Sequence, residues 1–148
     1  MLKGDTKISI PGGDTTIDFI VENFTLSAET VIESYDKQEE CVVNQPVCLT
    51  QASSSRDYMM IRTENIELIV TLDQKMYVYD KDEWVSARDL KKGMMLLSRH
   101  DDPCEITEVL RVRDEGLTRV FSLSVADQTN FYANGLLTHS PNTGACDE

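Results

Sequence analysis

The Asn134-Gly135 pair, close to the end of the 148-residue chain, constrains the fold more than any other sequence feature. Asn-Gly beside apolar runs is the strongest short-range signal for a β-hairpin, because both residues accept the positive φ angles of a tight turn. Apolar segments at 120–125 and 136–137 are joined here through Asn-Phe-Tyr-Ala and this pair. The hairpin places His139 and Ser140 at a strand end, where a histidine beside a hydroxyl is suited to chemistry on the backbone itself.

The rest of the chain predicts an all-β domain. Short runs dense in β-branched and aromatic residues alternate with polar turns, and helical periodicity is weak. We expect about ten short strands and at most two short helices, one from Ser27 towards Tyr35 and one at 86–92 closed by Gly93. The expected strands lie at 7–10, 41–43, 47–49, 58–63, 66–71, 75–79, 95–97, 106–112 and 120–125, with a polar break at 51–57.

Composition narrows the class of protein. A hydrophobic content of 41% over this length suits one domain with a real core, which we place at 1–140, and the polar stretch 141–148 reads as a tail. The net charge of -12 is spread along the chain, and the largest basic cluster is Lys91-Lys92, so nucleic acid and anionic membranes are not expected partners. No apolar run approaches the roughly 18 residues of a membrane span, and no signal peptide is visible, so we expect a cytoplasmic protein.

The four cysteines, Cys41, Cys48, Cys104 and Cys146, form no Cys-x-x-Cys pair and have no histidines at ligand spacing. No metal site is therefore expected. In a cytoplasmic protein Cys41 and Cys48 are expected to be half-buried thiols, and a pairing of the two across a hairpin stays open.

Three blocks, in the same order and at the same separations, resemble the Hint (hedgehog/intein) superfamily, and its intein branch most closely. They are Leu-Lys-Gly-Asp-Thr-Lys-Ile at 2–8, the stretch 61–75 in the position of the block that carries Thr-x-x-His, and Asn-Phe-Tyr-Ala-Asn-Gly-Leu-Leu-Thr-His at 130–139. The segment 83–93 is similar to the usual connecting segment. The resemblance extends from Met1 to Ser140.

The resemblance implies the all-β Hint fold and protein splicing, an autocatalytic series of acyl transfers that uses no cofactor. The partners would be the flanking polypeptides (exteins) in cis, and the domain would act as a monomer, a minimal intein without an endonuclease insert. The positions that match the family's site are Met1, Thr71, Gln74, Ser122, His139 and Ser140.

Several of these positions depart from the family pattern. Met1 stands where a nucleophilic cysteine is usual, and a thioether has no proton to lose. Gln74 replaces the histidine of Thr-x-x-His and carries no titratable proton at neutral pH. Ser122 stands where many inteins have aspartate, and Thr129 where a histidine often precedes Asn-Phe.

The C-terminal end allows two alignments. In one, Ser140 replaces the terminal asparagine and Pro141 follows the domain. In the other, the asparagine is absent and Ser140 is the first residue after the domain, with 141–148 as a remnant of the flanking protein. In both, no side-chain amide is present to form a succinimide and cut the chain.

Three functions remain open from the sequence: an intein-type domain inactive in this form, a non-catalytic Hint module that serves as a spacer or binding domain, and hedgehog-like autoprocessing. Thr71 is either a site residue or a buried cross-strand threonine. We expect a surface position for His100 and a loop for Cys104 rather than a nucleophile. Trp84 and Tyr77 are expected to serve packing.

Overall fold

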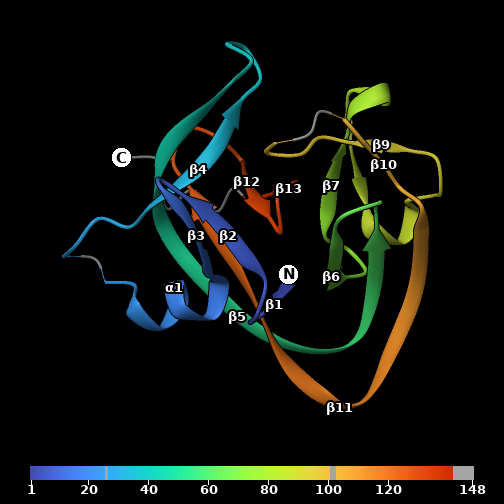
Figure 1. The fold of residues 1–148 in the computed structure, drawn as a ribbon. Helices are drawn as coiled ribbons and strands as arrows, with labels where there is room; N and C mark the ends of the chain where they lie inside the picture. Colours follow the sequence, from blue (N-terminus) through green and yellow to red (C-terminus); the bar gives the residue numbers. More distant parts are fainter. Residues whose placement is uncertain (26, 101–102, 142–148) are drawn as a thin grey trace.

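The computed structural model describes residues 1–25, 27–100 and 103–141, and it is an all-β structure with one short α-helix (Figure 1). In chain order the elements are β1 (Leu2–Lys3), β2 (Lys7–Ile10), β3 (Gly13–Thr16), α1 (Ile17–Asn23), β4 (Val31–Asp36), β5 (Cys41–Arg62), β6 (Glu67–Thr71), β7 (Lys75–Val78), η1 (Tyr79–Lys81), β8 (Glu83–Ser86), η2 (Ala87–Asp89), β9 (Met95–Leu96), β10 (Cys104–Glu105), β11 (Glu108–Val125), β12 (Asn130–Ala133) and β13 (Leu136–His139).

Two long, curved strands, β5 and β11, run antiparallel along the lower side of the view in Figure 1 and connect its two halves. Their pairing extends from Arg62↔Glu108 to Val47↔Val125, with a register shift between Arg113 and Thr118. The expected polar break at 51–57 is wrong, because these residues lie within β5. Their backbone groups pair with β11 while Ser53 and Ser54 are exposed, so the strand continues without apolar side chains to mark it.

The strands form two sheets. One has the order β11-β1-β6-β5-β4, with β11 also paired to β5, and the other follows the path β10-β9-β7-β13-β12-β2-β3, with β8 on β7. The two-residue strand β1 is held between β11 and β6 through the pairs Leu2↔Phe121 and Leu2↔Val70. This position brings the N-terminus to the middle of the molecule (Figure 1).

The first block of the sequence has a structural reason for its glycine. A Cβ on Gly4 would lie 3.2 Å from atoms of Asp18 and 3.3 Å from the Phe121 ring, so this close approach favours glycine. Thr6, which is 3% exposed, accepts the Ile17 amide and donates its own amide to the Lys3 carbonyl. Together these contacts fix the chain directly after residue 1.

The expected hairpin at Asn134-Gly135 is confirmed. The two residues have φ angles of 49° and 85°, and they join β12 to β13 with the register Asn130↔His139. The Asn134 side chain accepts the Lys7 amide and donates to the Glu67 carbonyl, so the turn is also tied to β2 and β6. His139 is the last residue of β13, as predicted.

The expected helices are the main errors of the sequence prediction. The stretch 31–36 is β4, which pairs with 41–46 of β5, and the one α-helix in the described residues is α1 at 17–23. In α1 the buried Ile17 and Ile20 have helical spacing, and Phe19 faces solvent. At 86–92 only the 3₁₀ turn η2 is present, while Gly93 does have the positive φ, 95°, that was expected of it.

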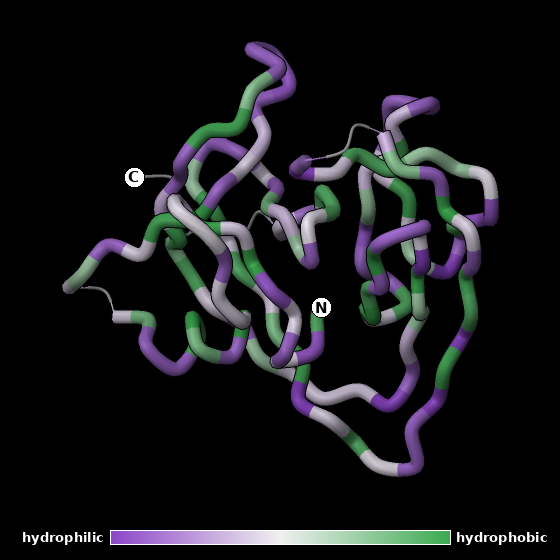
Figure 2. The backbone as a smooth tube through the Cα atoms, viewed as in Figure 1, coloured by the Kyte–Doolittle hydropathy of each residue, from purple (hydrophilic) through white to green (hydrophobic). Residues whose placement is uncertain are grey.

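The buried apolar side chains of the core form two clusters. Leu2, Ile61, Leu68, Val70 and Leu123 belong to the larger one. A smaller cluster comprises Tyr77, Leu97, Tyr132 and Leu137, with Trp84 packed against it. Figure 2 shows hydrophilic residues at the outer turns, including the turn between β4 and β5.

Two further expectations concern cysteines and membranes. Cys41 is an exposed, free thiol, whereas Cys48 is disulfide-bonded, so these two are not paired with each other and the expectation of a thiol is wrong for Cys48. The described part of the chain contains no helix that is long and apolar enough to cross a membrane. The expected tail at 141–148 falls, after Pro141, outside the described residues.

Candidate functional site

An open cavity of about 710 Å³ lies where the N-terminus, the β6–β7 turn and the end of β13 meet. Five of the six candidate site residues named from the sequence line this cavity, although they lie up to 138 residues apart in the chain. The sixth, Ser140, does not line the cavity, but its sequence neighbours His139 and Pro141 do. The lining comprises Met1, Gln51, Ser53, Ser54, Ser55, Asp57, Thr71, Leu72, Asp73, Gln74, Lys75, Arg88, Val120, Ser122, His139 and Pro141.

The nitrogen of Met1 is the centre of the site. The amino group donates to Thr71 Oγ1 over 2.6 Å and to Gln74 Oε1 over 2.8 Å, while the Met1 carbonyl accepts the Thr71 amide over 2.9 Å. Burial lowers the pKa of this amino group from 8.0 to about 6, against the opposing effect of the Asp73 carboxylate. The backbone at residue 1 is therefore held on both its N–H and its C=O sides.

Gln74 links the two ends of the domain. Its side chain, 7% exposed, accepts from the Met1 nitrogen through Oε1 and donates through Nε2 to the His139 carbonyl over 2.9 Å. The turn between β6 and β7 positions it, because the Gln74 amide donates to the Thr71 carbonyl over 3.1 Å. One side chain thus contacts both the first residue and the peptide bond between His139 and Ser140.

The His139 imidazole is held by aromatic contact. Its ring meets the Trp84 indole edge-to-face, with centroids 5.1 Å apart and planes at 73°, and Trp84 meets Tyr77 in the same way at 5.4 Å. Burial, and secondly the Lys75 ammonium, lower the pKa of His139 below its usual value of 6.5. The ring is therefore neutral at pH 7 and has a lone pair available to accept a proton.

Ser140 is fully buried, so its hydroxyl is not on the surface. The hydroxyl donates to the Leu123 carbonyl over 2.5 Å, and the Ser140 amide donates to the Thr129 carbonyl over 2.8 Å. The carbonyl of Pro141 accepts from Ser124 Oγ over 3.1 Å. The chain is thus anchored to β11 on both sides of the bond between 140 and 141.

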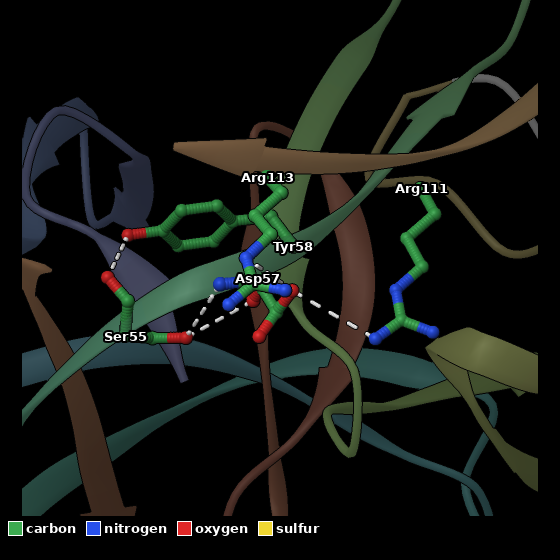
Figure 3. A network of polar contacts seen from close by, with 5 residues as sticks. All are labelled: Ser55, Asp57, Tyr58, Arg111 and Arg113. Carbon is green, nitrogen blue, oxygen red and sulfur yellow. Dashed lines mark hydrogen bonds and ion pairs between the residues drawn. The ribbon is translucent and has the colours of Figure 1, made fainter. Parts of the chain in front are cut away.

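The opposite wall of the cavity is polar and comes from β5 and β11. Ser122 is 4% exposed and lies opposite Gln51 in the register of the pair. Asp57 forms long ion pairs with Arg111 (3.7 Å) and Arg113 (3.9 Å), next to the register shift (Figure 3). Its Oδ1 is the one buried side-chain oxygen or nitrogen among the described residues that accepts or donates no hydrogen bond.

Two residues at the site did not enter the sequence prediction as site residues. Asp73 accepts the Thr71 hydroxyl over 3.0 Å and faces the cavity, and its position between Thr71 and Gln74 in Thr-x-x-Gln is the signal that could have indicated it. Trp84 was expected to serve packing, and it does, but it also contacts His139. No sequence spacing relates Trp84 to His139, because β8 and β13 become neighbours by pairing with the same strand, β7.

The residues expected to be bystanders lie elsewhere. His100 is exposed and lines a different cavity, beside Asn134. The expected loop at Cys104 is wrong, because this residue lies in the short strand β10, paired with β9. Cys104 is absent from the lining of the site cavity. Within the described ranges no group of three or more His, Cys, Asp or Glu side chains is arranged to hold a metal ion.

Comparison with known proteins identifies the fold. The sequence matches no family profile and no curated protein. The structure is similar to that of a bacterial intein-like domain from Clostridium thermocellum, with a TM-score of 0.81, 18% identity and coverage of 94% of this chain and 97% of the other. It is also similar to a DnaB intein from Synechocystis sp. PCC 6803 (TM-score 0.77, 19% identity, 95% and 98% coverage) and to the PabCDC21-1 intein (0.79, 21%, 95% and 98%). The chain therefore has the Hint fold, the fold of the inteins.

Proposed function

We propose that the chain is a protein-splicing domain of the intein type, without an endonuclease insert, whose reaction is arrested in this form because the nucleophiles at its two ends are absent. The observation that carries the proposal is the position of Gln74. Its side chain joins the nitrogen of residue 1 to the carbonyl of residue 139. Splicing requires the two ends of the domain to be held at one site, and this contact does so.

The contacts at residue 1 suit the first step of such a reaction. In a longer chain the Met1 nitrogen would be the leaving group of the preceding peptide bond, and Thr71 and Gln74 lie within hydrogen-bonding distance of it. With a cysteine at this position, the thiol would attack the preceding carbonyl carbon and the C–N bond would break as the nitrogen gains a proton. The thioether of Met1 has no such proton and does not attack.

The burial of Ser140 supports the alignment in which it is the last residue of the domain. Its side chain is enclosed and bonded to Leu123, as expected for a position inside the fold, and the bond that follows it leads into the cavity at Pro141. An asparagine at position 140 would close on its own carbonyl carbon and release the chain after it. Serine has no amide nitrogen to do this, and Pro141 offers no hydroxyl or thiol as an acceptor.

His139 has the properties of a proton acceptor in this scheme. A neutral imidazole at residue 139, which lines the same cavity as Pro141, could take the proton from an attacking amide nitrogen. The flanking polypeptides in cis are the only partners the mechanism needs, and it uses no cofactor.

The test is a precursor with a polypeptide block ahead of position 1 and the changes Met1→Cys, Gln74→His and Ser140→Asn. Incubation with a small thiol, followed by intact-mass measurement, should show release of the block. The matched control carries Met1→Ala with the other two changes, and it should stay whole because it has no nucleophile. A folded precursor that stays whole with Cys at position 1 would favour a non-catalytic Hint module instead.

A further inference from the structure

The contact between Thr71 and Asp73 defines which way the threonine hydroxyl faces. Thr71 Oγ1 lies 2.6 Å from the Met1 nitrogen and 3.0 Å from Asp73 Oδ1. A hydroxyl has one hydrogen, and an ionised carboxylate can only accept, so the hydrogen is directed to Asp73. The lone pairs of Oγ1 are then left for the nitrogen of residue 1.

We propose that Asp73 is a positioning residue of the splicing site, which fixes the Thr71 hydroxyl so that its oxygen accepts the N–H of residue 1. This inference rests on the proposed function. The hydrogen bond of Asp73 is to Thr71 and not to residue 1 itself, and Asp73 is exposed at the rim of the cavity.

The neighbouring acceptor makes this orientation matter. Gln74 Oε1 lies 2.8 Å from the same nitrogen, and a free amino group can donate to both Oε1 and Thr71. In a precursor the nitrogen is an amide with a single hydrogen, so only one acceptor can bind it. With Asp73 present, the hydrogen of the Thr71 hydroxyl is directed to the carboxylate, and Oγ1 faces the nitrogen as an acceptor in addition to Gln74 Oε1.

Asp73 affects residue 1 in two ways, through its hydrogen bond to Thr71 and through its negative charge. The carboxylate opposes the lowering of the Met1 pKa that burial causes. Replacement by asparagine removes the charge but keeps an acceptor oxygen at the same place, whereas replacement by alanine removes both. The two variants therefore separate positioning from charge.

The experiment uses the precursor described above, with Met1→Cys, Gln74→His and Ser140→Asn. We expect Asp73→Ala to slow thiol-induced release at least about tenfold, and Asp73→Asn to remain within about threefold of the parent. Asp14→Ala is the matched control, because Asp14 is exposed on β3 and does not line the site cavity. In a Thr71→Val background, Asp73→Ala should have no further effect, since the group it positions is gone. Equal rates for the parent and Asp73→Ala would overturn the inference.

A second measurement tests Asp73 even if the parent precursor releases nothing, in which case the proposed function itself fails. In the unaltered chain, the pKa of the Met1 amino group is followed by NMR. We expect Asp73→Ala to lower it more than Asp73→Asn, because only asparagine keeps Thr71 turned towards the nitrogen. Equal values in the two variants would show a pure charge effect and would refute the positioning role.

Discussion

The buried amino group of Met1 makes the stability of this domain depend on pH near neutrality. In the folded chain its pKa is about 6, whereas 8.0 is the ordinary value that applies when the chain is unfolded. Between these two values the unfolded chain binds more protons than the folded one, so the free energy of unfolding falls as the pH is lowered from 8 to 6. The difference corresponds to about 2 to 3 kcal/mol, which is a large part of the stability of a typical domain.

Urea denaturation at pH 8.5 and pH 5.5 measures this effect. With urea m-values of about 1–3 kcal/mol/M, the transition midpoint should fall by roughly 1–2 M at the lower pH. The control is the same chain with an acetylated amino terminus, which cannot bind the proton. All side chains are the same in the two chains, so the comparison isolates the Met1 amino group. The same pH dependence in the free and acetylated chains would refute the reasoning.

Three further predictions follow from single contacts. Gln74→Leu should lower the free energy of unfolding by about 2–3 kcal/mol, because the nitrogen of residue 1 and the His139 carbonyl both lose the Gln74 side chain as a buried partner. Thermal or urea denaturation measures this loss. An unchanged stability would mean that Gln74 does not bridge the two ends. Trp84→Ala should raise the pKa of His139 towards 6.5, since the indole that buries the ring is lost, and NMR titration of the imidazole should show a smaller rise for Trp84→Phe. Asn134→Ala should lower the free energy of unfolding by about 2 kcal/mol, because alanine tolerates the φ of 49° poorly and makes neither side-chain hydrogen bond. Asn134→Gly should lower it by less, and the opposite order would contradict the assigned turn.

Local signals in the sequence were sufficient for the hairpin and for naming five residues that line the cavity. The Asn134-Gly135 turn was predictable because its φ angles depend on two adjacent residues. Met1, Thr71, Gln74 and His139 could be named because the separate blocks keep the order and spacing of the intein pattern. Their meeting in one cavity is a property of the fold, and the structure shows it directly.

The long strand β5 could not be read from side chains. At 53–55 three serines in succession suggest a loop, yet the backbone there pairs with β11 over its full length. The stability of this pairing comes from the partner strand, 63 to 67 residues away along the chain, which no local pattern reports. The same cause explains β4, where the pairing with 41–46 decides between helix and strand.

Side-chain neighbours at the site were also beyond the sequence. The place of Asp73 within Thr-x-x-Gln was its one signal in the sequence, but its contact with Thr71, which in turn binds the nitrogen of residue 1, is visible only in the structure. Trp84 contacts His139 because two strands pack on β7. Such contacts depend on side-chain orientation at atomic scale, and sequence patterns fix only which residues belong to the region.

The most direct test of an arrested splicing domain is to restore the missing groups and measure ligation. The precursor carries polypeptide blocks on both sides and the changes Met1→Cys, Gln74→His, Ser140→Asn and Pro141→Ser. Intact-mass spectrometry should then show the two blocks joined by a peptide bond, together with the released domain, and neither product should form with Met1→Ala in place of Met1→Cys. A precursor that is folded by circular dichroism but keeps its full mass would contradict the account.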